Sequence, residues 1–132
     1  MSYWIFVMKG TIIDFQTRMK SKFWPIKKKT GNKNNLQKND RVVFYLGGPN
    51  NMKFMGTATI SSELKPMGDD FVIELHKIEI WEKPISVPQI LDSLTFIPNK
   101  KNWGFFFQGV IVWISKNDYN LIINKNMTSN EF

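Results

Sequence analysis

Tryptophan beside lysine is the most distinctive chemistry in this sequence of 132 residues. In KFWPIKKK, Trp24 lies between Lys22 and a run of three lysines, and in NKKNWG, Trp103 follows a second basic loop. Lysines bind phosphates with little sequence preference, and aromatic faces stack on unpaired bases. The combination favours binding of single-stranded or extruded bases over reading of a duplex groove. Burial in the core is the alternative for each tryptophan, and the residue types alone leave both alternatives open.

A catalytic constellation is hard to assemble from the remaining residues. The chain has one histidine, His76, and no cysteine, which excludes cysteine–zinc sites and thiol nucleophiles. We expect His76 to be a half-exposed structural residue within a predicted strand. Asp69 and Asp70, which are neighbours in the sequence, favour a solvated loop. Neither a P-loop nor a G-x-G-x-x-G motif occurs in the sequence. We therefore expect a protein that is not an enzyme and that needs no metal or cofactor.

The net charge is +7, from 18 basic and 11 acidic residues, and it favours a polyanionic partner. A lysine surplus that only aids solubility is the alternative explanation. The apolar runs are much shorter than the ~20 residues of a bilayer span, and the first residues lack the basic start of a signal peptide. A chain without cysteine suits a reducing compartment. We expect a cytoplasmic protein that binds RNA or DNA and no membrane.

The elements that would position Trp24 come first in the chain. The continuous apolar run Tyr3–Met8 predicts a strand that is buried on both faces. Thr11 and Asp14 form a capping-box pattern that predicts the start of a helix. The apolar stripe predicted for this helix consists of Ile12, Phe15, Met19 and Phe23. Pro25 disfavours helical geometry in the preceding residue, so we expect the helix to stop there and a basic loop to follow.

The middle of the chain predicts antiparallel strands. The runs Arg41–Leu46 and Lys53–Ile60 are joined by a turn rich in glycine and asparagine. A polar loop leads to the next strand, Phe71–Ile80, and Pro84 is expected to end that strand's extension. The apolar residues of Phe71–Ile80 change parity near His76. Since one strand cannot bury both parities on one face, this change predicts a β-bulge.

The last third predicts a short helix, a strand and a final helix. The short helix is indicated by the spacing of Val87, Ile90, Leu91 and Leu94. Phe105–Ile114 predicts a strand, and Ser115 caps a helix that ends near Ile123. The order of elements predicts an α+β domain, residues 1–123, followed by a polar tail, residues 124–132. Its mixed sheet of five to six strands would curl into a barrel with short helices outside.

Six segments within residues 3–123 follow one another in a recognisable order. They are YWIFVMK, KFWPI, KNDRVVFYL, KFMGTATI, IEIWEKPI and LTFIPNKKNWGFFFQGVIVWISKNDYNLI. Together they resemble the EVE domain of the PUA-like superfamily, which is related to the YTH domains that read methylated adenine. The resemblance implies a PUA-like β-barrel flanked by helices. It also implies a non-catalytic module that binds RNA or DNA and holds one extruded, modified base in an aromatic-walled pocket.

The resemblance implies roles for particular residues. Trp24 corresponds to the tryptophan that forms one cage wall in YTH domains, and the end of the first strand would meet the base edge. The implied base pocket consists of Trp24, Met8, Lys9, Gly10, Pro25, Ile26, Phe54, Gly56, Leu64 and Met67. The expected phosphate-binding residues are Lys22, Lys27, Lys28, Lys29, Lys33, Lys100 and Lys101. Trp103 and Phe107 are assigned as structural residues or as a second aromatic wall.

Two positions depart from the family pattern. The loop of residues 61–70 has no aromatic residue where YTH domains place a second tryptophan, so Leu64 or Met67 would serve there. Gln108 stands where many relatives have arginine. The base and the type of nucleic acid therefore stay open, and an effector protein in trans would supply any output. Two alternatives remain beside the base reader: a general RNA-binding domain without selectivity for modification, and an enzyme built on the same scaffold.

Overall fold

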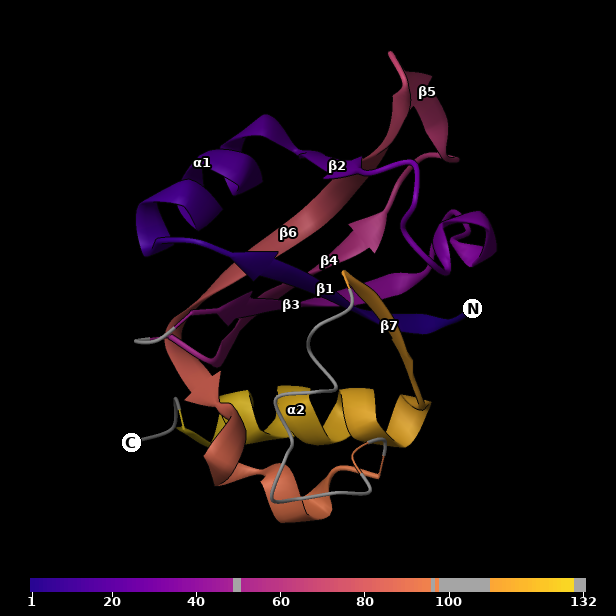
Figure 1. Cartoon of the computed structure of the whole chain (residues 1–132). Helices are drawn as coiled ribbons and strands as arrows, with labels where there is room; N and C mark the ends of the chain where they lie inside the picture. The colour runs from indigo at the N-terminus through magenta and orange to yellow at the C-terminus, as the bar shows by residue number, and fades with distance from the viewer. Residues whose placement is uncertain (49–50, 96, 98–109, 130–132) are drawn as a thin grey trace.

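The computed structural model describes residues 1–48, 51–95, 97 and 110–129. In this part of the chain, a seven-stranded mixed sheet curls between two α-helices (Figure 1). The strands follow the order β2-β6-β4-β3-β1-β7, and β5 pairs with β6 outside this path. The α+β prediction with a curled mixed sheet is confirmed, with one strand more than expected. None of the described helices is long and apolar enough to cross a membrane.

Strand β1 (Tyr3–Lys9) is a central strand that is buried on both faces. It pairs in parallel with β3 (Arg41–Gly47) and antiparallel with β7 (Ile111–Ile114). A strand covered on both faces can be apolar at every position, which is why its sequence does not alternate. The prediction of a doubly buried first strand is confirmed, although the part of the predicted Phe105–Ile114 strand before residue 110 lies outside the described residues.

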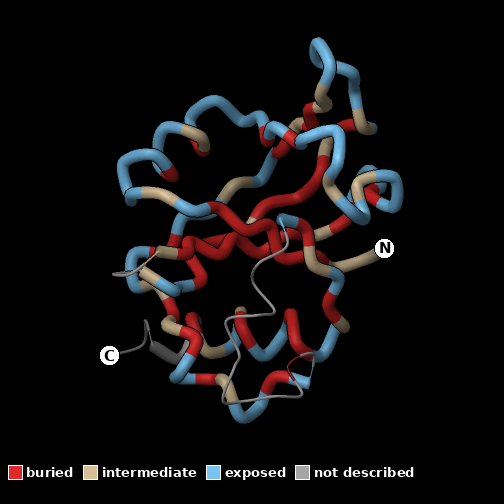
Figure 2. The backbone as a smooth tube through the Cα atoms, viewed as in Figure 1, coloured by how far each residue is buried: buried red, intermediate tan, exposed pale blue. Residues whose placement is uncertain are grey.

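The side chains of β1 alternate between two hydrophobic clusters, one on each face of the sheet. The first cluster contains Trp4, Phe6 and Met8 together with side chains of α1 and β2. The second contains Ile5 and Val7 together with side chains of α2 (Lys116–Ser129). Figure 2 shows buried backbone along the central strands and exposed backbone over most of the periphery. The candidate site described below adjoins the first cluster.

Helix α1 (Ile12–Ser21) begins at the predicted capping box. The Thr11 hydroxyl accepts a hydrogen bond from the Asp14 backbone N–H at 3.0 Å, and the Asp14 carboxylate accepts one from the Thr11 N–H at 3.1 Å. The helix ends before Pro25, as expected, at Lys22 in the left-handed region with φ of 62°. The predicted apolar stripe is wrong at both ends, because Ile12 is half exposed and the helix stops before Phe23.

Strand β2 (Phe23–Ile26) occupies the place where a loop was expected to begin. Among the described strands it lies at the edge of the sheet, and it pairs antiparallel with β6 (Asp70–Ser86). The Phe23 N–H donates to the Ser21 hydroxyl at 3.2 Å, away from β6, so by alternation the backbone of Pro25 also faces the free edge. Proline lacks an N–H and is tolerated at such a position. Pro25 thus stops the helix without preventing a strand.

The predicted strand pair and bulge are confirmed. β3 pairs antiparallel with β4 (Lys53–Ile60), and β4 pairs antiparallel with β6. Between the pairs Thr57–Glu79 and Thr59–His76, β6 contains one extra residue, and Lys77 takes a positive φ of 51°. The prediction that Pro84 ends the strand is wrong, since β6 continues to Ser86.

Three further elements differ from the predictions. β5 (Lys65–Met67) forms a short hairpin with β6 through Gly68, whose φ is 62°, where a polar loop was expected. Two 3₁₀ turns, η2 (Val87–Gln89) and η3 (Leu91–Ser93), replace the predicted short helix. Helix α2 runs to Ser129, past the predicted end near Ile123. Each error concerns a short or polar segment whose conformation depends on contacts elsewhere.

A buried carboxylate joins the start of β1 to the start of β3. Asp40 is only 2% exposed, and it accepts hydrogen bonds from the Ser2 N–H at 2.9 Å, the Trp4 indole N–H at 2.9 Å and the Gln37 N–H at 3.0 Å. Buried polar groups are tolerated when their hydrogen bonds are satisfied, and hydrogen bonds to a charged group are the stronger ones. Asp40 therefore sets the register at which the central parallel pair begins.

We predict that Asp40→Ala lowers the free energy of unfolding by at least about 3 kcal/mol, because three donors, including the buried Trp4 indole, lose a charged acceptor. The free energy of unfolding of Asp40→Asn should lie between those of Asp40→Ala and the unaltered protein, since the amide oxygen can still accept hydrogen bonds. Urea denaturation measures the change. Asp69→Ala, at an exposed carboxylate, is the control and should shift the value by no more than about 0.5 kcal/mol. Equal effects of the two alanine variants would contradict the role given to Asp40.

Candidate functional site

A pocket of about 620 Å³ opens between helix α1 and strands β2, β5 and β6. Its lining residues are Met8, Asp14, Thr17, Arg18, Ser21, Phe23, Pro25, Met67 and Val72. Small-molecule pockets usually measure about 300–1,000 Å³, so this pocket has room for a nucleobase-sized ligand. Its four polar residues all belong to α1, and its other residues are apolar. A ligand in the pocket would therefore meet one polar wall and one apolar wall.

The polar wall is a single face of α1. The four residues are Asp14, Thr17, Arg18 and Ser21, and their sequence positions differ by three, one and three. This spacing places them on one side of a helix with 3.6 residues per turn. The neighbouring face carries Phe15 and Met19, which are buried in the first cluster. Burial of that apolar face fixes the rotation of the helix and turns the polar face toward the pocket.

The apolar wall is assembled by strand pairing. Pro25 of β2 and Lys65 of β5 lie opposite Val72 of β6 on its two sides. Met67 lies two residues beyond Lys65, so its side chain shares the face of Val72 and Pro25. The short β5 hairpin, which the sequence did not predict, is therefore what brings Met67 to the pocket.

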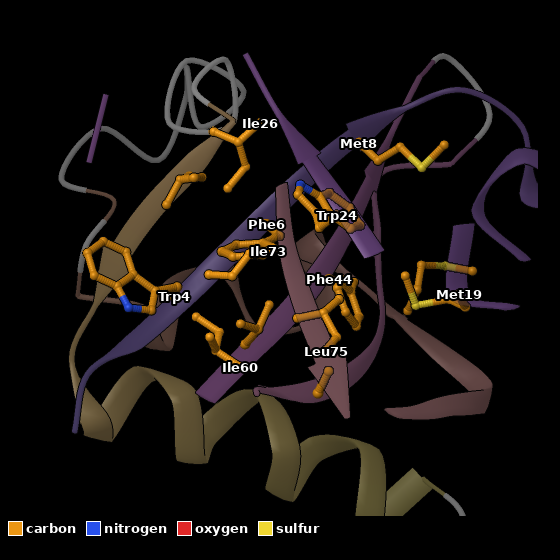
Figure 3. Close-up of a cluster of buried hydrophobic side chains, with 14 of the residues drawn as sticks. Trp4, Phe6, Met8, Met19, Trp24, Ile26, Phe44, Ile60, Ile73 and Leu75 are labelled. Atoms are coloured by element: carbon orange, nitrogen blue, oxygen red, sulfur yellow. The ribbon is translucent and has the colours of Figure 1, made fainter. Parts of the chain in front are cut away.

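Trp24 lies on the opposite face of β2 from Phe23 and Pro25, and it is 0% exposed. Its ring is stacked on Phe44 at a centroid distance of 5.3 Å and an interplanar angle of 26°, and it contacts Phe6 at 5.3 Å with a tilt of 45°. Figure 3 shows Trp24 beside Phe6 and Phe44, with Met8 and Met19 toward one side of the view. Trp24 is thus part of the core and is not itself a lining residue of the pocket.

Arg18 joins Trp24 to the pocket. Its guanidinium carbon lies 4.8 Å from the centroid of the Trp24 ring, and the same side chain lines the pocket. Phe44 and the Arg18 guanidinium both lie against the indole ring. Stacking of arginine on tryptophan is a favourable cation–π arrangement. The surface that the pocket presents in front of Trp24 is therefore the guanidinium of Arg18.

The indole N–H of Trp24 is buried and finds no acceptor within the described residues. An unpaired buried donor costs about 1–3 kcal/mol. Such groups are uncommon in native proteins, and a functional site is one recognised explanation for them.

Local hydrogen bonds and burial shift two pKa values at the polar wall. The pKa of Asp14 is lowered, mainly by the backbone N–H of Thr11, with smaller effects of the Thr11 hydroxyl and of Arg18. The pKa of Arg18 is lowered by burial, while the charge of Asp14 acts in the opposite direction. Both side chains stay charged near neutral pH. The wall thus carries a cation in front of Trp24 and a carboxylate one helical turn away.

The structure brings some of the predicted pocket residues together and separates others. Met8, Pro25 and Met67 line one pocket, with Trp24 directly behind Arg18. Phe54 lies in the second cluster, on the other face of the sheet, where it contacts Tyr45 at 5.6 Å. Its side chain therefore cannot form the floor of the pocket beside α1, because strand β4 alternates and turns Phe54 away from the first cluster.

The other predicted pocket residues surround this site without lining it. Ile26 is buried in the first cluster. Gly56 approaches β6 so closely that a Cβ atom would overlap the Glu79 carbonyl oxygen. Close pairing of the strands therefore explains why this position is a glycine. Leu64 is half-buried and borders a separate, polar pocket of about 610 Å³ together with Lys33 and Lys38.

Lys9 and Gly10 were expected to meet the base edge. Lys9 is exposed at the end of β1, and the Gly10 carbonyl already accepts a hydrogen bond from the Asn51 side chain at 3.0 Å. Neither residue lines the pocket beside α1. Polar contacts to a ligand there would come from side chains of α1, which the sequence did not indicate.

The lysines form an exposed run beside the pocket. Lys22 is exposed at the end of α1, and Lys27, Lys28 and Lys29 are exposed directly after β2, whose Pro25 lines the pocket. Lys33 is half-buried, with its Nζ atom 6.0 Å from the centroid of the Phe71 ring. Lys100, Lys101, Trp103, Phe107 and Gln108 lie outside the described residues.

Sequence reasoning missed Asp14, Thr17, Arg18, Ser21, Phe23 and Val72 as lining residues. The signal for four of them was available in the polar side of the predicted helix. The apolar stripe of a helix faces the core and its polar side usually faces solvent, so a polar face alone does not indicate a pocket. Within the described residues, no group of three histidine, aspartate or glutamate side chains is placed to hold a metal ion.

The curled mixed sheet with a helix on each face is a PUA-like fold, as comparison with solved structures shows. Protein Atu2648 from Agrobacterium tumefaciens has a TM-score of 0.70 at 11% identity, covering 96% of this chain and 93% of that one. Human THYN1, in complex with 5-methylcytosine containing DNA, has a TM-score of 0.66 at 10% identity over 96% and 98%. The YTH domain-containing protein mmi1, in complex with RNA, has 0.63 at 11% identity over 99% and 87%. These likenesses are of fold.

The sequence itself matches the EVE domain family over residues 2–124. This chain therefore belongs to the EVE domain family, as its ordered segments indicated. No curated protein matches the chain in sequence. The family and the fold are thus established, while the use of the pocket has to be argued from its own residues.

We predict that Trp24→Ala lowers the free energy of unfolding by about 3–5 kcal/mol, as truncation of a buried tryptophan usually does. Trp24→Phe should cost less than about 2 kcal/mol, because it keeps the stack on Phe44 and removes the unpaired N–H. Urea denaturation measures both values. The control is Trp113→Phe, at a tryptophan that is 56% exposed, with a change of no more than about 0.5 kcal/mol. A nearly neutral Trp24→Ala would show that the indole is not a core residue.

Proposed function

We propose that this protein holds one extruded, modified base of RNA or DNA in the pocket between α1 and β2, without making or breaking a bond. The observation that carries the proposal is the pocket itself. An apolar wall of strand residues faces a polar helix wall in which Arg18 is stacked on the buried Trp24. A base needs both kinds of surface, since its faces are apolar and its edge forms hydrogen bonds.

The relatives support the same use of the fold. Human THYN1 has been solved with DNA that contains 5-methylcytosine, and the YTH domain-containing protein mmi1 has been solved with RNA. Both share the fold of this chain over nearly its whole length. By analogy, the partner proposed here is RNA or DNA carrying a modified base, and an effector protein in trans would convert binding into an output.

Selectivity for a modified base would come from the apolar wall. A methyl group placed against Met8, Met67 or Val72 leaves water and gains about 0.8 kcal/mol, which corresponds to roughly a fourfold gain in affinity. Methionine suits this role because its thioether side chain adapts to the shape of a flat ring. An unmodified base would fill the same pocket less completely and bind less tightly.

The lysines next to the pocket would hold the phosphate backbone. Extruding a base from its stack costs a few kcal/mol, and phosphate contacts together with stacking in the pocket would offset that cost. Lys27, Lys28 and Lys29 follow the pocket strand directly and are exposed. The strand that forms the wall therefore leads straight into the basic run.

A second candidate function rests on this basic run alone. In a general RNA-binding domain, the exposed lysines and the net charge of +7 would supply the affinity, and the pocket would stay unused. Binding would then weaken strongly with salt but would not depend on base modification. The two candidates differ in a measurable ratio, the affinity for a modified strand divided by that for its unmodified twin.

We predict a ratio of about three to five for short single-stranded oligonucleotides with one central N6-methyladenine or 5-methylcytosine, in DNA or RNA form, measured by fluorescence anisotropy. Met67→Ala should reduce the ratio toward one, since it removes part of the apolar wall. Met127→Ala, at an exposed methionine of α2, is the matched control and should leave the ratio unchanged.

The salt series separates the contributions of pocket and lysines. Raising the salt concentration should lower the affinity for modified and unmodified strands by the same factor, because phosphate contacts are common to both. A ratio of one in the unaltered protein, for every base and both backbones, would overturn the reader and leave the general RNA-binding domain. A ratio that survives Met67→Ala unchanged would show that the pocket described here is not the site of recognition.

A further inference from the structure

Arg18 takes the position that the sequence assigned to Trp24. Its guanidinium lies 4.8 Å from the centre of the indole, and it lines the pocket, whereas Trp24 does not. Trp24 is 0% exposed and is stacked on Phe44 in the core. A base that enters the pocket therefore meets the cation first, with the indole as the layer behind it. We propose that the guanidinium of Arg18, backed by Trp24, is the stacking wall for the bound base, and that its charge selects neutral bases over positively charged ones.

The geometry favours this role over that of a simple phosphate contact. A planar guanidinium stacks on aromatic rings with one face and can offer the second face to another flat group. Its partner Trp24 is immobilised by Phe6 and Phe44, at 5.3 Å from each ring. A side chain held on a rigid ring keeps its orientation, so less conformational entropy is lost when a base stacks on it. Among the described residues, no aromatic ring supports Lys27, Lys28 or Lys29 in this way.

The charge of Arg18 has a consequence for the kind of base. An unmodified base and a base methylated on an exocyclic nitrogen or on a carbon are neutral, whereas a base methylated on certain ring nitrogens carries a positive charge. A positive ring stacked on a guanidinium brings two like charges together in a partly buried site, where their repulsion is stronger than in water. Arg18 therefore predicts discrimination against cationic bases.

Asp14 also lines the pocket and would attract a cation. Its carboxylate, however, accepts a hydrogen bond from the Thr11 N–H at 3.1 Å. It also lies in the first turn of α1, where the helix dipole offsets a negative charge. Arg18, in contrast, lies directly over Trp24. Removing the charge of Arg18 would leave Asp14 as the only charge among the pocket residues, so the preference should move toward cationic bases.

The inference rests on the proposed function, because it takes the ligand to be a base. The first experiment compares two isomers, N6-methyladenine, which is neutral, and 1-methyladenine, which is positively charged at neutral pH. Each stands once in the same single-stranded oligonucleotide, and anisotropy gives the affinity. We expect the unaltered protein to bind the neutral isomer more tightly. Arg18→Gln should weaken the neutral isomer about tenfold and bring the two affinities together or reverse their order.

Two further variants separate stacking from charge. Arg18→Lys keeps the charge without the planar group, so it should still reject the cationic isomer while losing most of the affinity for the neutral one. Lys20→Gln removes the same charge from an exposed position of α1 and should weaken both isomers equally. If Arg18→Gln binds the neutral isomer more tightly, Arg18 blocks the site rather than forming its wall, and the proposal is wrong. Effects of Arg18→Gln equal to those of Lys20→Gln would reduce Arg18 to a phosphate contact and overturn it as well.

A spectroscopic measurement distinguishes this inference from the proposed function. The chain has two arginines, Arg18 and Arg41, so a ¹⁵N spectrum contains two arginine Nε–H signals. A base stacked on Arg18 should shift its signal by the ring current, while the Arg41 signal should stay in place. A shifted Arg18 signal together with equal affinities for methylated and unmethylated strands would refute modified-base reading and keep Arg18 as the wall. Preferential binding of methylated strands with an unmoved Arg18 signal would refute the wall and keep the reader.

Discussion

The stack of Phe44, Trp24 and Arg18 is the interaction on which the candidate site depends. Phe44 holds one face of the indole at 5.3 Å, and the guanidinium lies 4.8 Å from its centre. The stack runs from the centre of the sheet through the edge strand β2 to the helix α1, so it fixes the relative position of the three elements. The core and the candidate binding surface are thus joined through neighbouring side chains.

The alternation of β2 divides the roles of its four residues. Trp24 and Ile26 point into the first cluster, while Phe23 and Pro25 belong to the exposed face of the strand. Because successive side chains of a strand point to opposite faces, Trp24 and Pro25 cannot both line the same surface directly. Arg18 of α1 resolves this conflict, since its side chain lies over the Trp24 ring and also lines the pocket. The helix thus connects the buried tryptophan with the pocket.

Much of the fold could be predicted because the deciding signals were local. The continuous apolar run of β1, the capping box of Thr11 and the parity change in β6 each depend on a few neighbouring residues. The strand β5 could not be predicted, because its three exposed residues carry no apolar pattern and exist as a strand only through pairing with β6. The end of α2 was misplaced for a related reason. Asn126 looks like part of a polar tail, yet it is buried and its side chain donates to the Lys83 carbonyl at 3.1 Å.

The candidate site, like the fold, was predicted from the sequence in some parts and decided by the tertiary structure in others. The sequence by itself determined the composition of the region, namely a tryptophan, a proline and a basic run after the first helix, and the family to which the chain belongs. Through the family resemblance, the sequence also placed Met8, Pro25 and Met67 in one implied pocket, and these three do line one pocket. Only the tertiary structure decided that Trp24 of KFWPIKKK is a core residue and that Arg18 stands in front of it. The physical reason is that exposure depends on which elements pack over a ring, and here a helix residue six positions earlier covers the face that the strand sequence alone left open.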